Sequence, residues 1–246
     1  MTDLHGKNAL VTGAARRLGK AIAVELARRG ANLVVHYRDS EAQATETCRE
    51  IESLGCRSVK VKADLSRLEE VRSLAAQATE RLGPIEILIN SASLFFRTPF
   101  GQVTGEQWDQ LFHINLQAPF FLAQSLASGM KSRGWGRIIN IGDAGTHYSS
   151  GDFLPYSMTK AALELMTKAL ARALAPEVQV CAVLPGPILP AESGDDEQWQ
   201  AAIRQTLLKK HGTPQDIALA VAFLLEQGDF LTGVLLPVDG GRRIGR

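Results

Sequence analysis

Cysteine is scarce in this sequence, and its distribution excludes two kinds of architecture. The chain has 246 residues and three cysteines, Cys48, Cys56 and Cys181, none of them spaced as a Cys-x-x-Cys pair. We therefore expect neither a disulfide framework nor a zinc cage, and no metal site is predicted. This cysteine usage fits a reducing compartment, the cytoplasm.

Long apolar runs and an excess of charge of one sign are also missing. The first seven residues lack the apolar stretch of a signal peptide, and the most apolar later run, 178–191, is too short and too rich in proline to span a bilayer. Lys and Arg total 27 against 26 for Asp and Glu, which argues against a nucleic-acid surface. We expect a cytoplasmic protein with no membrane or nucleic-acid partner that binds a small molecule.

The chain does contain a regular alternation of two hydrophobic patterns. Short β-branched or aliphatic runs occur at residues 9–12, 33–37, 59–63, 85–90, 137–141, 178–184 and 234–238. Helical periodicity lies between them, for example at 18–29, 41–54, 68–82 and 157–174. This alternation predicts a doubly wound, Rossmann-like α/β fold with about seven mainly parallel strands and helices on both faces. Residues 1–246 are predicted to form one domain.

A segment with little predicted regular structure, about 186–210, follows the sixth predicted strand. Open α/β sheets bind ligands at the carboxyl ends of their strands, so we expect this segment to act as a substrate lid. The alternative is a plain surface loop. The sequence does not predict its shape.

A glycine-rich turn, residues 12–19, follows the first predicted strand and precedes a helical pattern. Small residues there let the backbone approach a pyrophosphate, which then lies at the positive end of the helix. Glycines can also serve packing alone, but the position after an apolar strand favours a phosphate site. The predicted cofactor contacts of this turn are Gly13, Arg16, Arg17, Leu18 and Gly19.

The end of the second predicted strand indicates which nicotinamide cofactor is bound. An NAD-selective enzyme usually places an acid there to bind the ribose hydroxyls, but this chain has His36 and Tyr37. Arg38, the hydroxyl of Ser40 and an arginine of the glycine-rich turn can bind a 2′-phosphate through charge-assisted hydrogen bonds. NADPH is therefore predicted. Asp39 argues against it unless its side chain pairs with Arg38 or points to solvent.

Further cofactor contacts are predicted where later strands end. Asp64 is placed to accept a hydrogen bond from the adenine amino group, although it could also serve as the N-cap of the following helix. Small residues after the fourth strand would let the chain pass under the ribose and the nicotinamide. The predicted contacts in these segments are Asp64, Leu65, Asn90, Ser91, Ala92, Pro185, Gly186 and Ile188.

Tyr156 and Lys160 are four residues apart, so they face the same way on a helix. A lysine ammonium near a phenol lowers the phenol pKa, which makes the tyrosine a usable proton donor and acceptor near neutral pH. On its own, this spacing also fits an ordinary amphipathic helix.

The order of these features is more specific than any one of them. The glycine-rich turn, Asp64, the Asn90 segment, Asn115, Tyr156 with Lys160, Pro185-Gly186 and the run 238–241 resemble the short-chain dehydrogenase/reductase family over essentially the whole chain. The resemblance implies that Tyr156 donates the proton, Lys160 holds the nicotinamide ribose, and Asn115 anchors a water relay. It also implies a homotetramer formed through the helices that carry Asn115 and Tyr156.

One position departs from that family's pattern. The family usually has a serine thirteen residues before the tyrosine, and this chain has Asp143 there. An ionised carboxylate cannot donate a hydrogen bond to a carbonyl oxygen and would repel an alkoxide, which disfavours ketone reduction. It suits a ring whose nitrogen is protonated as hydride arrives at the adjacent carbon. Asp143 could instead be a turn or helix-cap acid.

Within the family, the pteridine reductases are the subgroup this chain resembles, through Asp143, the arginine-containing glycine turn, His36-Tyr37-Arg38 and the run 90–95. In that subgroup a phenylalanine stacks the pterin against the nicotinamide, and Phe95 holds the matching place, unless it is a core or interface aromatic. The chain end, 231–243, also resembles the dihydromonapterin reductases. The substrate contacts implied are Arg17, Ser93, Phe95, Asp143 and Tyr156, with a surface role as the alternative for Arg17.

The resulting hypothesis is an NADPH-dependent pteridine reductase that converts a dihydropteridine, of the dihydrobiopterin, dihydromonapterin or dihydrofolate class, to its tetrahydro form. A carbonyl reductase of the 3-oxoacyl thioester type is the first alternative. A non-catalytic NADPH-binding regulator is the second, although a mere sensor has no need of a tuned phenol.

Overall fold

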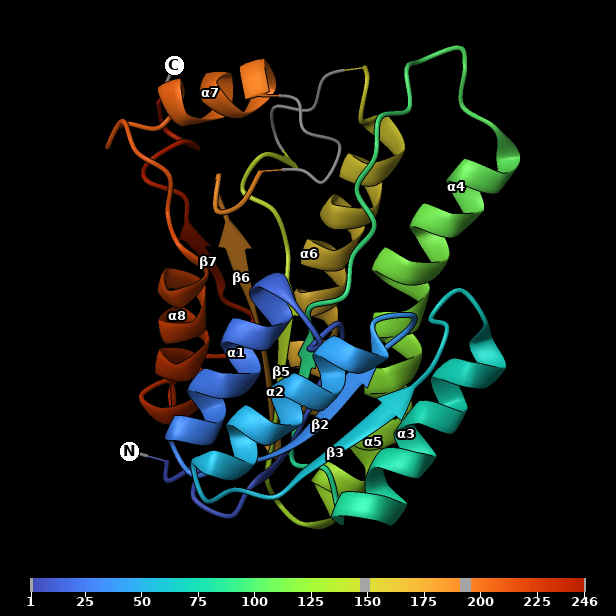
Figure 1. Cartoon of the computed structure of the whole chain (residues 1–246), viewed down its shortest axis with the longest axis vertical. Helices are drawn as coiled ribbons and strands as arrows, with labels where there is room; N and C mark the ends of the chain where they lie inside the picture. The colour runs from blue at the N-terminus through green and yellow to red at the C-terminus, as the bar shows by residue number, and fades with distance from the viewer. Residues whose placement is uncertain (1, 147–150, 191–195, 246) are drawn as a thin grey trace.

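The structure is a computed structural model that describes residues 2–146, 151–190 and 196–245 (Figure 1). Its centre is a sheet of seven strands in the order β3-β2-β1-β4-β5-β6-β7, with every neighbouring pair parallel. The strands are β1 (Asn8–Val11), β2 (Asn32–Tyr37), β3 (Ser58–Lys62), β4 (Ile87–Asn90), β5 (Gly136–Ile141), β6 (Val178–Pro185) and β7 (Leu235–Val238).

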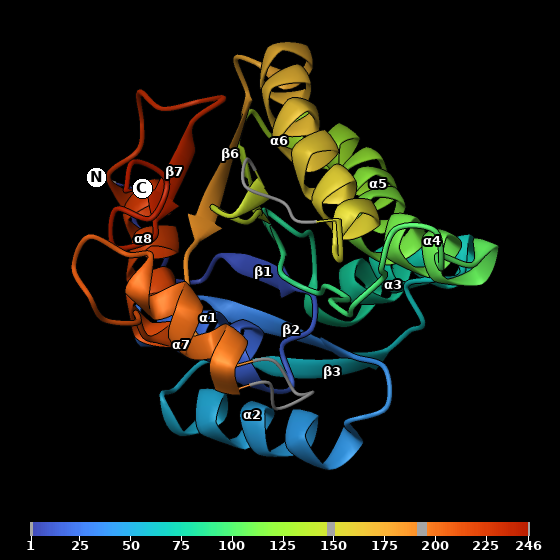
Figure 2. The ribbon, with the colours of Figure 1, turned by 90° about the horizontal axis from the view of Figure 1, so that it is seen from above.

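Helices cover both faces of this sheet, as the view from above shows (Figure 2). One face carries α1 (Arg17–Arg28), α2 (Glu41–Ser53) and α8 (Pro214–Glu226), and the other carries α3 (Leu68–Leu82), α5 (Ala118–Ser132) and α6 (Leu154–Leu174). The α4 helix (Gly105–Phe112) leads through the π-helix η1 (His113–Gln117) into α5, and α7 (Asp196–Arg204) lies beyond the strand ends. No helix in the described ranges has the length and apolarity needed to cross a bilayer.

Strand periodicity divides the apolar side chains between two cores. In β1, Ala9 and Val11 pack with α1, α2 and α8, whereas Leu10 packs with α3 and α5. Successive side chains of a strand point to opposite faces, so a sheet covered on both sides needs apolar residues at every position. All three of these side chains are fully buried.

The predicted fold class is confirmed by this architecture. The expected strands agree with the observed ones to within two residues at each end, and the helix expected at 68–82 has those bounds. Part of the segment expected as a lid, 186–210, is the helix α7, which the sequence analysis did not predict, while residues 191–195 of that segment lie outside the described ranges.

The order of the strands determines where a ligand can bind. The chain builds outward from β1 through β2 to β3 on one side, then returns to place β4 on the other side of β1. Connections on the two sides of this switch point diverge, which leaves a crevice at the carboxyl ends of the strands.

Candidate active site

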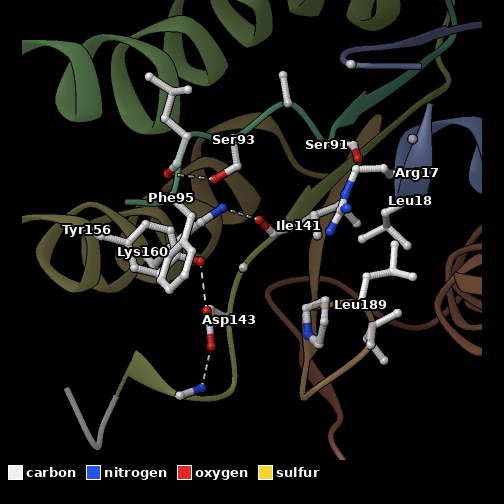
Figure 3. A pocket seen from close by; sticks show the side chains of 18 of the residues that line it. Arg17, Leu18, Ser91, Ser93, Phe95, Ile141, Asp143, Tyr156, Lys160 and Leu189 are labelled. Carbon is white, nitrogen blue, oxygen red and sulfur yellow. Dashed lines mark hydrogen bonds between the residues drawn. The ribbon is translucent and has the colours of Figure 1, made fainter. Parts of the chain in front are cut away.

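A cleft of about 1730 Å³ lies at the carboxyl ends of the strands (Figure 3). Its walls include the residues that follow strands β1 to β6. One residue from each of these segments, in chain order, is Gly13, Arg38, Asp64, Ser91, Asp143 and Gly186. The cleft therefore brings together both the predicted nucleotide segments and the predicted catalytic side chains.

The glycine-rich turn fits a pyrophosphate. Gly13 has φ +66°, and a Cβ on Gly19 would lie 2.2 Å from the Gly13 carbonyl oxygen, so neither position accommodates a side chain. The helix α1 follows with Arg16 as its N-cap, with no side-chain cap and no acid in the first turn. The positive end of α1 thus remains available to an anion.

Arg17 sits in this turn with a left-handed backbone, at φ +54°. Such a conformation costs a residue with a Cβ about 1 kcal/mol. Its Nη2 donates a hydrogen bond of 2.7 Å to the carbonyl oxygen of Pro190, on the segment after β6. The side chain therefore reaches across the cleft, where both cofactor and substrate contacts were predicted for it (Figure 3).

His36 supports the glycine-rich turn from behind. Its Nδ1 accepts a 3.0 Å hydrogen bond from the Gly13 amide, and its Nε2 lies 3.0 Å from the Ala63 carbonyl oxygen. Burial lowers the pKa of His36 to about 4, so the ring is neutral near pH 7. Both ring nitrogens are thus engaged by the protein, and His36 positions Gly13. His36 also lines the cleft, and its predicted cofactor contact stays a prediction.

In the region expected to bind the 2′-phosphate, Arg38 and Asp39 form an ion pair. Arg38 Nε donates a hydrogen bond of 2.5 Å to Asp39 Oδ2, and both side chains are exposed. Tyr37 is buried, and the side chain of Ser40 does not cap α2. Asp39 is thus paired with Arg38, one of the two arrangements that the sequence analysis named as compatible with NADPH.

Asp64 lies at the adenine end of the cleft. Its Oδ1 accepts hydrogen bonds from the amide (2.9 Å) and hydroxyl (2.8 Å) of Ser66. Burial raises the pKa of Asp64, but these bonds and the nearby Arg38 and Arg67 outweigh it and lower the pKa below its usual value. The N-cap of α3 is Arg67, so the alternative role of Asp64 as that cap is wrong, because a turn separates Asp64 from the helix.

The segment after β4 is tied to β1 by Thr12. Its hydroxyl accepts hydrogen bonds from the amides of Ser91 (2.9 Å) and Ala92 (3.0 Å), and both residues line the cleft. Asn90 instead points into the protein, where its Nδ2 donates a 2.8 Å bond to Asn140 Oδ1. Asn90 is buried and does not border the cleft, so its predicted cofactor contact is wrong.

Asp143 and Tyr156 form a hydrogen-bonded pair. The Tyr156 hydroxyl donates to Asp143 Oδ2 over 2.7 Å, while Asp143 Oδ1 accepts a 2.5 Å bond from the Gly145 amide (Figure 3). Burial, the Asp143 charge and this hydrogen bond all raise the pKa of Tyr156 well above its usual value of 10. The sequence analysis expected Lys160 to lower this pKa, and that expectation is wrong.

Lys160 bonds to the backbone and not to the phenol oxygen. Its Nζ donates a 2.9 Å bond to the Ile141 carbonyl and lies 5.8 Å from the centre of the Tyr156 ring. Burial lowers the pKa of Lys160 to about 8, and the Asp143 charge opposes that shift. The two side chains do come from one side of α6, as their spacing predicts, and both line the cleft.

Asn115 lies in η1, between α4 and α5. Its Oδ1 accepts bonds from the Leu94 amide (2.8 Å) and the Ser93 hydroxyl (3.2 Å). Its Nδ2 donates to the Leu94 carbonyl (2.9 Å) and to Thr159 Oγ1 (3.2 Å). Asn115 thus joins the segment after β4 to the helix that carries Tyr156.

Two aromatic rings border the catalytic pair. Phe95, 46% exposed, stacks on Phe153 with ring centres 4.8 Å apart and planes 7° from parallel. Its ring also meets the Tyr156 ring edge to face at 4.8 Å. The sequence analysis chose Phe95 and missed Phe153, although its place three residues before Tyr156 was a usable signal.

The far wall of the cleft comes from α7, which lies within the segment predicted as a lid, and from the segment after β7, to which sequence reasoning assigned no site residue. The helix α7 and the residue after it contribute side chains, and so does the segment after β7; they include Trp199, Ala202, Gln205, Arg242 and Ile244. Pro185, Gly186 and Ile188 line the cleft as predicted, and a Cβ on Gly186 would lie 2.6 Å from Asp239 Cα. This close approach brings the two chain segments together.

Comparison with known proteins identifies the family. The family model described as enoyl-(acyl carrier protein) reductase matches residues 13–243. The short-chain dehydrogenase/reductase FrzI of a Cladobotryum species is 34% identical over 251 residues, covering 97% of this chain and 96% of that protein. The chain belongs to the short-chain dehydrogenase/reductase family. It is an oxidoreductase of that family, as the catalytic residues led us to expect.

Solved structures of similar proteins cover the same length. A blue fluorescent protein from a metagenomic library, in complex with NADPH, is 36% identical with a TM-score of 0.92, covering 98% of this chain and 99% of that one. The FolM alternative dihydrofolate reductase 1 from Brucella canis, complexed with NADP, is 31% identical with a TM-score of 0.90, covering 100% of this chain and 97% of that one.

Proposed function

We propose that this protein is an NADPH-dependent pteridine reductase, which reduces a dihydropteridine to the tetrahydro form in the cytoplasm. The observation that carries the proposal is the hydrogen bond between Tyr156 and Asp143, at the position where the family usually has serine. A carboxylate there accepts a hydrogen bond from the phenol and, unlike the serine hydroxyl, has no hydrogen to donate to a carbonyl oxygen.

The proposed reaction adds a hydride and a proton across a carbon–nitrogen double bond. NADPH supplies the hydride when bound. Tyr156 holds its proton up to high pH because its pKa is raised, and Asp143 stabilises positive charge that develops on the ring nitrogen. The proton passes from Tyr156, directly or through water, to that nitrogen, and solvent then restores the phenol.

The cofactor assignment rests on the nucleotide half of the cleft. Gly13 and Gly19 leave room for a pyrophosphate at the N-terminus of α1, and Arg38 with Arg16 supplies cations for the 2′-phosphate. Lys160, which lines the cleft, would hold the nicotinamide ribose. Several similar structures were solved with NADP or NADPH bound, which supports the choice.

The substrate assignment has support from two kinds of observation. Phe95 offers an exposed aromatic face beside Tyr156, and a flat pterin ring stacked on it gains about 1 kcal/mol beyond its burial. The FolM proteins from Brucella canis and Brucella suis, both solved with NADP, are named as alternative dihydrofolate reductases. Ser93 and Arg17 border the same space and complete the proposed substrate contacts.

Assembly into a homotetramer is also part of the proposal. Leu154, Met158 and Leu165 lie four and eleven residues apart on one side of α6 and are 39%, 42% and 69% exposed. The opposite side packs into the protein's own core through Leu163, Thr167 and Ala171. A second copy would cover the exposed side, and light scattering would then give about four times the chain mass of 26.6 kDa.

The test is NADPH oxidation with dihydrobiopterin, dihydromonapterin, dihydrofolate and an acetoacetyl thioester offered separately. We expect turnover of at least one pterin, and Asp143→Ser should lower it by about 100-fold while leaving NADPH binding unchanged. Turnover of the thioester alone would instead favour a carbonyl reductase, a class that includes the similar angucycline C-6 ketoreductase LanV. Tight NADPH binding without turnover of any substrate would favour a regulator.

A further inference from the structure

Arg242 lines the cleft from the segment that follows β7. Its Nε and Nη2 both donate to Gln205 Oε1, over 3.1 and 3.0 Å. Gln205 comes directly after α7, so this fork joins two segments that are far apart in the sequence. The partner is a neutral amide, and within the described ranges Arg242 forms no ion pair.

The guanidinium lies beside the catalytic carboxylate rather than at the nucleotide end. A Cβ built on Gly145 would be 2.9 Å from Asp143 Oδ1 and 3.5 Å from Arg242 Nη1. Both atoms therefore border the space that a side chain at position 145 would occupy. The bonds to Gln205 use Nε and Nη2, while Nη1 is the nitrogen nearest Gly145.

One side of α7 also borders the cleft and ends at Gln205, the partner of Arg242. Trp199, Ala202 and Gln205 are three residues apart and all line the cleft, so they follow one side of the helix. The helix buries none of its residues. A substituent lying against Trp199 and ending at Arg242 would cover two side chains that the protein itself leaves half-buried.

We propose that Arg242, oriented by Gln205, binds a carboxylate on the side chain of the dihydropteridine substrate. This inference rests on the proposed function and narrows its substrate class to pterins that carry an acidic tail. A guanidinium suits this task because it stays charged and presents parallel N–H donors to both oxygens of a carboxylate. An uncharged polyhydroxyl tail at the same place has no opposite charge and no paired oxygens to match these parallel donors, so it gains less from Arg242.

A purely structural role for Arg242 predicts a different pattern. If its bonds to Gln205 only hold the chain end against α7, replacing Arg242 should disturb every substrate alike. If it binds a carboxylate, the effect should fall on KM for the acidic substrate alone, because kcat depends on Asp143 and Tyr156, which remain. The comparison of two substrates separates these cases.

The experiment compares wild type with Arg242→Gln on dihydrofolate, whose tail ends in carboxylates, and on dihydrobiopterin, whose tail is uncharged. We expect KM for dihydrofolate to rise about tenfold or more, with KM for dihydrobiopterin and for NADPH within about twofold and both kcat values retained. Arg242→Lys, which keeps the charge, should recover part of the lost affinity. Arg243→Gln is the matched control, since it removes the neighbouring charge, which does not line the cleft.

The outcomes distinguish this inference from the function on which it rests. Equal losses on both substrates, or no loss on dihydrofolate, overturn the role of Arg242 while pteridine reduction stands. A loss as large in Arg243→Gln also overturns it, since the effect would then follow net charge. Wild-type protein that reduces neither pterin overturns the proposed function and this inference together.

Discussion

The Tyr156 hydroxyl donates its hydrogen bond to Asp143 Oδ2 at 2.7 Å, while the Lys160 ammonium is directed to the Ile141 carbonyl. The phenol hydroxyl is therefore hydrogen-bonded to a carboxylate, and the lysine makes no bond to the phenol. This arrangement favours a tyrosine that keeps its proton up to high pH.

Removing the Asp143 charge should lower the pKa of Tyr156. Asp143 acts on the phenol through its charge and through the hydrogen bond, both of which raise the pKa. Asp143→Asn should therefore shift the Tyr156 titration to lower pH, toward the ordinary value of about 10. Tyrosinate absorbance can follow this, because the chain has only 3 tyrosines, and Tyr156→Phe identifies the relevant step by difference. An unchanged titration would show that burial alone sets the pKa.

Cofactor preference should depend on the Arg38–Asp39 pair. Arg38→Gln should raise KM for NADPH about tenfold and leave KM for NADH nearly unchanged, because only NADPH carries the 2′-phosphate. Asp39→Asn should lower KM for NADPH a few-fold, since it removes an anion bonded to Arg38 at 2.5 Å. Initial-rate measurements with both cofactors test this, and equal effects of Arg38→Gln on the two would contradict it.

Arg17 should show a backbone effect and a side-chain effect that can be separated. At φ +54°, Arg17→Gly should be more stable than Arg17→Ala by about 1 kcal/mol in denaturant unfolding, although both lose the guanidinium. Both variants should bind NADPH equally weakly. Lys209, at φ +53° and outside the cleft, provides the control: its Gly and Ala variants should show the same order of stability with normal NADPH binding. Normal binding by the Arg17 variants would refute the cofactor contact.

His36 should make the protein less stable in mild acid. The pKa of His36 falls from 6.5 to about 4 on folding. Below pH 6.5 the unfolded chain therefore binds more protons than the folded protein, and stability is lost as the pH falls from 6.5 to about 4. This contribution amounts to about 3 kcal/mol. The free energy of unfolding should be measured from pH 7 to 4.5. His36→Asn should remove the part of its pH dependence that comes from His36, whereas His5→Asn, at an exposed position, should retain it. A pH dependence that is unchanged in both variants would contradict the assignment.

Local patterns were sufficient to predict the fold because the residues of each strand show its hydrophobic pattern without reference to the rest of the chain. The run at 178–184 is apolar at nearly every position, which a strand buried on both faces demands wherever it lies in the sheet. The glycine-rich turn and the pairing of Tyr156 with Lys160 are equally local, since each depends on spacing within one turn or one helix. Those residues line the cleft as predicted.

Predictions failed where a side chain's direction depends on neighbours distant in the sequence. Asn90 ends a predicted strand, but its side chain bonds to Asn140 inside the protein instead of bordering the cleft. The lysine effect on Tyr156 failed for the same reason, because the Ile141 carbonyl takes the Lys160 ammonium. A buried polar group bonds to whichever partner the packed chain provides, and a single segment does not show that partner.

The sequence by itself determined the parallel α/β sheet, the place of the nucleotide turn and the presence of a carboxylate thirteen residues before Tyr156, because each follows from local periodicity or residue type. Only the tertiary structure decided that this carboxylate accepts a hydrogen bond from Tyr156, that Phe153 stacks on Phe95, and that Arg242 reaches Gln205 beside Gly145. These contacts join segments brought together by the order of the strands, and an interaction that falls off within a few ångströms exists only once the sheet has placed its partners.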